Sequence, residues 1–268
     1  MRDGSVSSEM RRVFALVFFA APLVASAQPA SLLAPEAAFA PEGPPVELSL
    51  RIPINPAPGQ APITPRQWAE MGAVALTGVG HLAASEAGLS AAYIPVVVGG
   101  WGGYVGYRGS TEPRFFRELG FTAENLGPAF RDATILAGAA TAGMLVIGAA
   151  QGTLRLDADM LPLLVLYPAW GVTQQMLVQG MITRHLADAG VSPYVVTPVS
   201  AAAFGSVHVP NWELTAATTG LGLAYAGLYQ RHENLWPLGI YHGVLGAGFY
   251  VWVLDRNPWE EMFGAAAE

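Results

Sequence analysis

The sequence predicts an all-α protein, a polytopic bundle of transmembrane helices, on three observations. Hydrophobic residues make up 52% of the 268 residues and charged residues only 12%, whereas about a quarter of an ordinary soluble domain is charged. Apolar segments long enough to cross a membrane follow one another from residue 68 to residue 256. Arginines concentrate in alternate connections between these segments, as the positive-inside rule requires.

Residues 1–27 are predicted to be a secretory signal peptide. Arg11 and Arg12 form a basic start, residues 13–24 are apolar, and residues 25–27 have the small-x-small pattern of a cleavage site. The residues before Met10 are polar, so a chain that starts at Met10 has the more typical signal. An uncleaved anchor helix is the alternative for the same segment.

Three further regions follow the predicted signal peptide. Residues 28–67 form a proline-rich tail or linker, because dense prolines exclude regular helices and sheets. Residues 68–256 are predicted to be one helical membrane domain, and residues 257–268 a C-terminal tail.

Seven apolar segments of the domain are predicted to be helices. The second segment is the weakest, because a glycine-rich stretch at residues 99–103 interrupts it. The seven segments are 69–88, 91–107, 131–150, 159–182, 193–209, 214–230 and 235–254.

Arginine placement predicts which end of the helices faces the cytoplasm. Arg155 and Arg256 fall at the outer end, against six arginines at the cytoplasmic end. A cleaved signal leaves the following tail outside, so residues 68–107 must then cross the membrane an odd number of times. Two complete helices there conflict with this, so either one segment is re-entrant or interfacial, or the signal prediction is wrong. The six cytoplasmic arginines are Arg108, Arg114, Arg117, Arg131, Arg184 and Arg231.

Three polar islands interrupt the apolar segments, and polar side chains within a membrane mark functional positions by default. The first island is Gln174-Gln175-Met176-Leu177-Val178-Gln179-Gly180. The second is Phe204-Gly205-Ser206-Val207-His208, and the third is Ile240-Tyr241-His242.

The order and spacing of these islands resemble the motifs of the CPBP family, the CAAX-type intramembrane endopeptidases, over residues 159–250. That family has a glutamate pair followed by an arginine (EExxxR), then FxxxH, then HxxxN. This sequence keeps Phe204 and His208 of the second motif and His242 of the third. It has glutamines at all three places of the first motif, and Gly246 replaces the asparagine. The resemblance implies the helical membrane domain of these proteases.

The match to the family places Gln174, Gln175, His208 and His242 at the catalytic positions. Hydrolysis of a peptide bond needs a general base to activate water. A glutamine amide keeps the shape of a glutamate but cannot accept a proton. The resemblance therefore implies a protease homologue that is catalytically impaired.

Gln179 and Phe204 are the predicted substrate-binding residues. Gln179 follows Gln175 by four positions, so we expect the two amides to form a neutral hydrogen bond where the family has an ion pair. An arginine without its carboxylate would be an unpaired charge within the membrane, which is strongly unfavourable. The three glutamines are therefore interpreted as a coordinated replacement.

Three functions stay open. The first is binding of a membrane peptide or protein partner in the cavity without cleavage. The second is an active intramembrane endopeptidase that relies on His208 and His242 as bases. The third is a structural membrane subunit whose polar side chains join helices by hydrogen bonds. All three are expected in the bacterial inner (cytoplasmic) membrane, with the lipid bilayer around the helices.

No metal, cofactor or nucleic acid is expected. Two histidines are too few ligands for a stable zinc site, and the net charge of −7 does not suggest a nucleic-acid surface. His81 and Glu86 on the first segment are further candidates to line the cavity. His185 is expected at the membrane interface, without a functional role.

Overall fold

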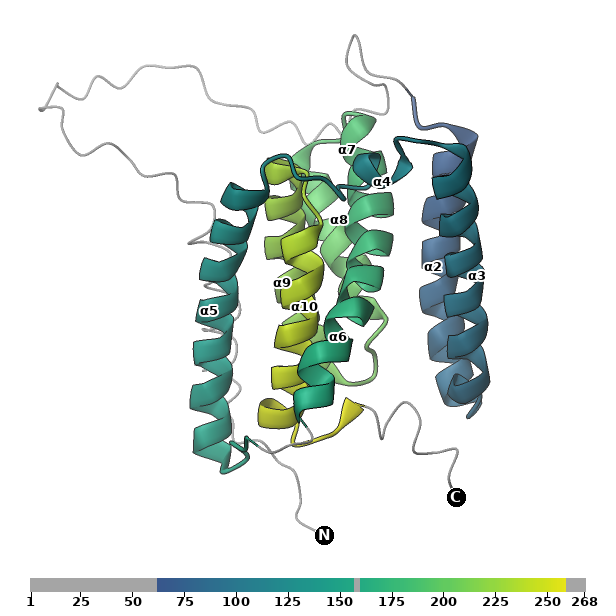
Figure 1. Ribbon diagram of the computed structural model, residues 1–268. Coiled ribbons are helices and arrows are strands. Elements are labelled where there is room, and N and C mark those ends of the chain that lie inside the picture. Colours follow the sequence, from purple (N-terminus) through teal and green to yellow (C-terminus); the bar gives the residue numbers. More distant parts are fainter. Residues whose placement is uncertain (1–61, 157–159, 259–268) are drawn as a thin grey trace, which may run out of the picture.

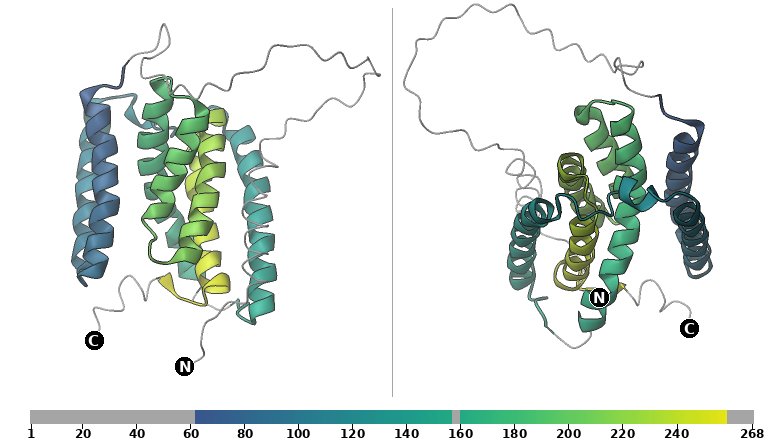
Figure 2. Two further views of the ribbon diagram at one scale, coloured as in Figure 1. Left: turned by 180° about the vertical axis from the view of Figure 1, so that it is seen from behind. Right: turned by 45° about the horizontal axis from the view of Figure 1, so that its top comes forward.

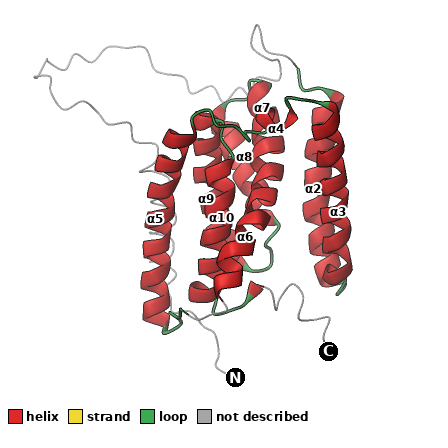
Figure 3. Cartoon of the chain, viewed as in Figure 1, coloured by secondary structure: helices red, strands yellow, loops and turns green. Residues whose placement is uncertain are grey.

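The computed structural model describes residues 62–156 and 160–258, and all regular structure in these ranges is helical (Figures 1 and 3). Each of the seven predicted segments corresponds to a helix, which confirms the all-α fold. The predicted signal peptide, most of the proline-rich tail and most of the C-terminal tail lie outside the described residues. The helices are α2 (Pro65–Glu86), α3 (Ser90–Thr111), α4 (Phe115–Glu118), α5 (Leu126–Gln151), α6 (Met160–Gln175), η1 (Met176–Thr183), α7 (Arg184–Asp188), α8 (Pro193–Ser206), α9 (Trp212–His232), α10 (Trp236–Gly248) and η2 (Phe249–Val253).

α2 begins at a complete capping box. The Thr64 side chain accepts from the Gln67 backbone N–H, and the Gln67 side chain accepts from the Thr64 backbone N–H at 2.8 Å. Pro65 occupies the first helical position, where a backbone N–H would have no partner within the helix, so a proline costs no hydrogen bond. α3 then runs unbroken through residues 99–103, so the expected glycine interruption is wrong. Glycine is common in membrane helices, which explains its tolerance there.

The core of the bundle forms where glycines let helix backbones touch. A Cβ added at Gly243 would lie 2.3 Å from the Cα of Pro168. One added at Gly171 would lie 2.5 Å from the carbonyl oxygen of Gly239. α6 and α10 therefore pack in direct backbone contact. Small residues are the usual means of such packing in membranes, where burial away from lipid gives little driving force.

α2 and α3 form a hairpin that lies beside this core (Figure 2). α2 contacts η1 and α8, whereas α3 packs on α2 and α4. We call this pair of helices the α2–α3 hairpin. It is attached to the core mainly through one of its two helices.

The two ends of the bundle differ in charge. The six arginines predicted to be cytoplasmic lie at the end where α3 and α9 finish and α5 begins. Arg155 lies at the opposite end, paired with Asp255 at 2.6 Å. α2 begins and α3 finishes at the arginine-rich end, so each runs the length of the bundle (Figure 1). Residues 68–107 therefore form two antiparallel helices of similar length, and residue 62 lies at the arginine-rich end.

Within residues 62–156 and 160–258, two helices are long and apolar enough, by length and composition, to cross a membrane. They are α5, Leu126–Gln151, and the continuous helix Met160–Asp188 that α6, η1 and α7 form together. Several large apolar side chains also face outward, among them Leu76, Val96 and Val165, each more than 70% exposed. Exposed apolar surface of this extent marks a face that meets another apolar medium or a partner.

Candidate functional site

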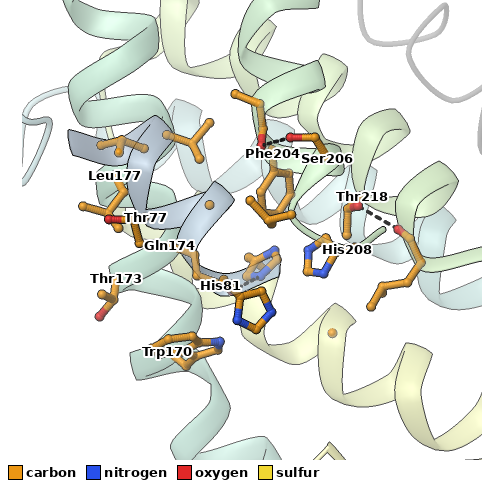
Figure 4. A pocket seen from close by; sticks show the side chains of 18 of the residues that line it. Thr77, His81, Trp170, Thr173, Gln174, Leu177, Phe204, Ser206, His208 and Thr218 are labelled. Atoms are coloured by element: carbon orange, nitrogen blue, oxygen red, sulfur yellow. Dashed lines mark hydrogen bonds between the residues drawn. The ribbon is translucent and has the colours of Figure 1, made fainter. Parts of the chain in front are cut away.

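A cavity of about 640 Å³ lies between the α2–α3 hairpin and the core helices. The hairpin lines one side, and α6, α8, α9 and α10 supply most of the other. Figure 4 shows His81, Gln174 and His208 pointing into one space beside Phe204. Most of the lining is apolar. Apart from tyrosines, the described residues that bring a hydroxyl, amide or imidazole group to the lining are Thr77, His81, Ser85, Ser90, Thr173, Gln174, Ser206, His208, Thr218 and His242.

Gln174 of α6 and His242 of α10 contact each other at this cavity. The Nε2 atom of His242 lies 2.8 Å from the Oε1 atom of Gln174. Because an amide oxygen only accepts, the imidazole donates this hydrogen bond. The neutral ring then carries its proton on Nε2, which leaves a free lone pair on Nδ1. That Nδ1 atom is buried and has no hydrogen-bond partner among the described residues.

His208 reaches the same cavity from the turn that follows α8. Its Nε2 atom is buried and also lacks a hydrogen-bond partner in the described part of the chain. The Phe204 ring contacts both imidazoles edge-on, with centroid distances of 6.0 Å to His208 and 5.0 Å to His242. The structure thus brings Gln174, His208 and His242 to one cavity, as both hypotheses of a functional site require.

His81 lines the cavity from the hairpin side, whereas Glu86 is exposed and does not. No aspartate, glutamate or arginine lines the cavity within residues 62–156 and 160–258. The imidazoles are therefore the strongest bases that face it from the described chain. No three potential metal ligands come together in these ranges either.

Gln175 and Gln179 lie outside the cavity lining and are fully buried between helices. Gln179 Nε2 donates to Gln175 Oε1 at 3.2 Å, which confirms the predicted neutral hydrogen bond. The Thr183 hydroxyl lies 2.7 Å from Gln179 Oε1 and 2.7 Å from the Ser200 hydroxyl of α8. Because the amide oxygen only accepts, Thr183 donates to it and Ser200 can donate to Thr183. We call these four residues the neutral ladder.

The neutral ladder corrects two predicted roles. Gln179 was expected to bind substrate, but its side-chain oxygen and nitrogen are both bonded within the ladder and it has no exposed surface. Gln175 was placed with the catalytic residues, yet its side chain faces away from the cavity that Gln174 lines. Neighbours along a helix point in different directions, so the two halves of the glutamine pair belong to different environments.

Gly246 lines the cavity at the place where the family pattern has an asparagine. A Cβ at this position would lie 2.7 Å from Cε1 of Tyr167, closer than real side-chain contacts. The Tyr167 ring therefore occupies the space that a larger residue at position 246 would need. The loss of the asparagine is accompanied by packing that fills its place.

A second polar group, not predicted from the sequence, lies at the arginine-rich end of the hairpin. Glu70 of α2 is buried and accepts hydrogen bonds from Arg108 and Tyr104 of α3. The Nε2 atom of His185 lies 2.6 Å from the other carboxylate oxygen of Glu70. We call Glu70, Tyr104, Arg108 and His185 the charged cluster. An acidic residue within an apolar segment needs a partner, and Glu70 was the signal in the sequence for this cluster.

The capping box of α2 fixes the proton of His185. The side-chain oxygen of Gln67 accepts a hydrogen bond from Thr64. The NH₂ group of the same side chain therefore faces His185 Nδ1, at 3.4 Å. Nδ1 therefore accepts, and Nε2 donates to Glu70. Arg108 also donates to Glu112 at 2.7 Å, and this hydrogen bond lowers the pKa of Glu112. His185, expected at the interface without a role, thus fastens α7 to the α2–α3 hairpin.

Comparison with known proteins finds a family whose model matches the core helices. Residues 156–247 match the family described as Type II CAAX prenyl endopeptidase Rce1-like. No curated protein and no solved structure matches the chain significantly. The matched residues run from α6 into α10 and contain all three motifs, so the match confirms the resemblance to the CPBP family. Over this region the chain is similar to CAAX-type intramembrane proteases.

Proposed function

We propose that this Rce1-like protein binds a membrane peptide or a partner helix in its cavity without efficient cleavage. The observation that supports this most directly is the contact of Gln174 with His242 at 2.8 Å. An amide that cannot accept a proton stands where the family has its general base. No carboxylate of the described chain lines the cavity to replace it.

The cavity retains the means to bind. Its lining is mostly apolar, and the buried His208 Nε2 and His242 Nδ1 atoms have no partner among the described residues. A buried polar atom without a hydrogen bond is unfavourable, so a ligand that supplies the missing bonds is stabilised. A peptide in the membrane can fill the apolar space and meet these atoms.

An active endopeptidase is the second candidate, because both histidines keep an unbonded nitrogen at one cavity. In this case His208 accepts a proton from water while the water oxygen attacks the carbonyl carbon of the substrate. The C–N bond then breaks, and the proton passes to the leaving amine. A structural subunit is the third candidate, for which the cavity has no ligand at all.

A cleavage assay in membranes separates these functions. The wild type, Gln174→Glu, and the triple variant Gln174→Glu/Gln175→Glu/Gln179→Arg are compared on candidate transmembrane peptides. We expect no turnover by the wild type and a gain in the triple variant, which restores both the base and the buried ion pair. Robust wild-type turnover that is lost in His208→Ala would establish the active endopeptidase instead. A structural subunit predicts that His208→Ala and His242→Ala impair assembly and leave no binding to measure.

The proposed setting is the cytoplasmic membrane, crossed several times, with the arginine-rich end inside. The chain has no cysteine, so single cysteines can report the side of each end. Glu118 is exposed at the arginine-rich end, and Leu156 is 84% exposed at the other. A membrane-impermeant maleimide added to spheroplasts should label Leu156→Cys at once and Glu118→Cys only after lysis. The reverse pattern would invert the orientation, and labelling of both would argue against a membrane crossing between them.

A further inference from the structure

We infer that the cavity selects a membrane peptide that presents a free amide group, with an unbonded N–H and an unbonded C=O, between two apolar stretches. The inference rests on the proposed function, because it specifies what the bound peptide must carry. It starts from the two buried imidazole nitrogens that have no partner in the described chain, His208 Nε2 and His242 Nδ1.

Gln174 fixes whether the Nδ1 atom of His242 donates or accepts a hydrogen bond. Since His242 donates through Nε2 to the Gln174 oxygen at 2.8 Å, its Nδ1 atom can only accept. A ligand must therefore bring an N–H or O–H donor to this atom. A purely hydrocarbon ligand, such as an acyl chain, leaves it unsatisfied.

The Nε2 atom of His208 is free either to donate or to accept a hydrogen bond. No protein group in the described chain bonds His208 Nε2, so a neutral His208 can place its proton there and donate to a carbonyl oxygen. Phe204 holds both imidazole rings against one phenyl ring. An acceptor and a donor that both come from the lining of one cavity are complementary to an amide.

An intact transmembrane helix does not offer such an amide from its backbone. Its N–H and C=O groups are bonded to each other four residues apart, and none is free in mid-membrane. A proline or a Gly-Pro break frees backbone groups around it. The amide of a glutamine side chain carries the same donor and acceptor. Both sources supply the chemistry that the two histidines require.

The test measures binding of four labelled peptides, each of about 20 residues so that it spans the bilayer, to the full chain in lipid vesicles. The protein carries a donor dye at Ser110→Cys, which is exposed and distant from the cavity lining. The peptides are a continuous leucine–alanine helix, the same helix with a central Gly-Pro, the same composition with Gly-Pro at the first turn, and the continuous helix with a central glutamine. Energy transfer to the peptide gives the apparent affinity.

We expect the peptide with a central Gly-Pro, the one with a central glutamine, or both to bind about ten-fold more tightly than the other two. Which of the two binds tells whether the amide comes from the backbone or from a side chain. His208→Phe keeps a ring against Phe204, and with this variant the affinities of the four peptides should lie within about two-fold of one another. His232→Phe, which lies outside the cavity lining, should leave the preference intact.

A second measurement needs no variant of the site. The ring-nitrogen chemical shifts of His208 and His242 should move when a preferred peptide is added to the wild type, and stay in place with the continuous helix. Equal binding of all four peptides without these shifts would overturn the inference and leave the proposed function standing. Failure of every peptide to bind would overturn both.

Discussion

The charged cluster and the neutral ladder both use side chains of the continuous helix Met160–Asp188, yet they bury polar groups in opposite ways. Glu70 in the cluster is paired with Arg108 and His185, so the cluster keeps its charges and matches them. The ladder has no charge, and each side chain in it is bonded to the next. The first arrangement needs every partner in place, whereas the second only needs hydrogen bonds.

Position explains why the two solutions differ. Glu70 lies near the start of α2, at the arginine-rich end, where charged groups are least costly because water is near. Gln175 and Gln179 lie in the interior of the helix Met160–Asp188, where an unmatched charge is most costly. The family has an ion pair at this inner place, and this chain has replaced all of it.

The largest effect is expected where a charge is placed in the neutral ladder. Gln179→Arg puts a cation beside Gln175 and Thr183 without an acidic partner, and should lower the free energy of unfolding by about 3–5 kcal/mol. The loss is measured by thermal unfolding of the detergent-solubilised protein. Gln175→Glu/Gln179→Arg should recover most of it, because the two charges pair. If the double variant is as unstable as the single one, the ladder is not a neutral replacement of an ion pair.

A smaller loss is expected from removing a charge in the charged cluster. Arg108→Met leaves the buried Glu70 carboxylate with Tyr104 and His185 as its only partners, and should cost about 2–4 kcal/mol in the same unfolding measurement. Arg117→Met is the matched control, because Arg117 pairs with Glu124 at the surface, both side chains being more than 60% exposed. It should cost less than about 1 kcal/mol. Equal losses in the two variants would show that burial does not distinguish this cluster from a surface pair.

The smallest effect concerns a single hydroxyl of the neutral ladder. Thr183→Val keeps the shape but leaves Gln179 Oε1 and the Ser200 hydroxyl short of one bond, which should cost about 1–2 kcal/mol. Thr173→Val on the same helix serves as a control, because its hydroxyl bonds only to the Ala169 backbone. That change should stay within about 0.5 kcal/mol. A neutral result for Thr183→Val would mean that the ladder is not held together by these bonds.

The helices and the placement of the three motifs followed from local patterns in the sequence. Apolar runs located the helices, and the spacing of Gln175 and Gln179 predicted their hydrogen bond. Such features depend on residues a few positions apart, which one sequence displays directly.

The charged cluster could not be found in the same way. Glu70 meets Arg108 and His185 across 38 and 115 positions of the chain. A single sequence does not show which polar residues of distant segments meet. Arg108 was assigned to a cytoplasmic loop for the same reason, and the burial of its side chain at the end of α3 came only from the structure. The filling of the space at Gly246 by Tyr167 likewise depends on packing between helices.

The two sides of the cavity differ in their similarity to known proteins. The residues matched to the family begin at 156, so they include the side with Gln174, His208 and His242. The other side comes from the α2–α3 hairpin, with His81 and Trp101 among its residues, and precedes the match altogether. Ligand preference can therefore diverge through mutations in the hairpin alone while every motif position stays fixed. Knowledge of what Rce1-like proteins accept bears on the matched wall of this cavity and leaves the opposite wall to be learned from this protein itself.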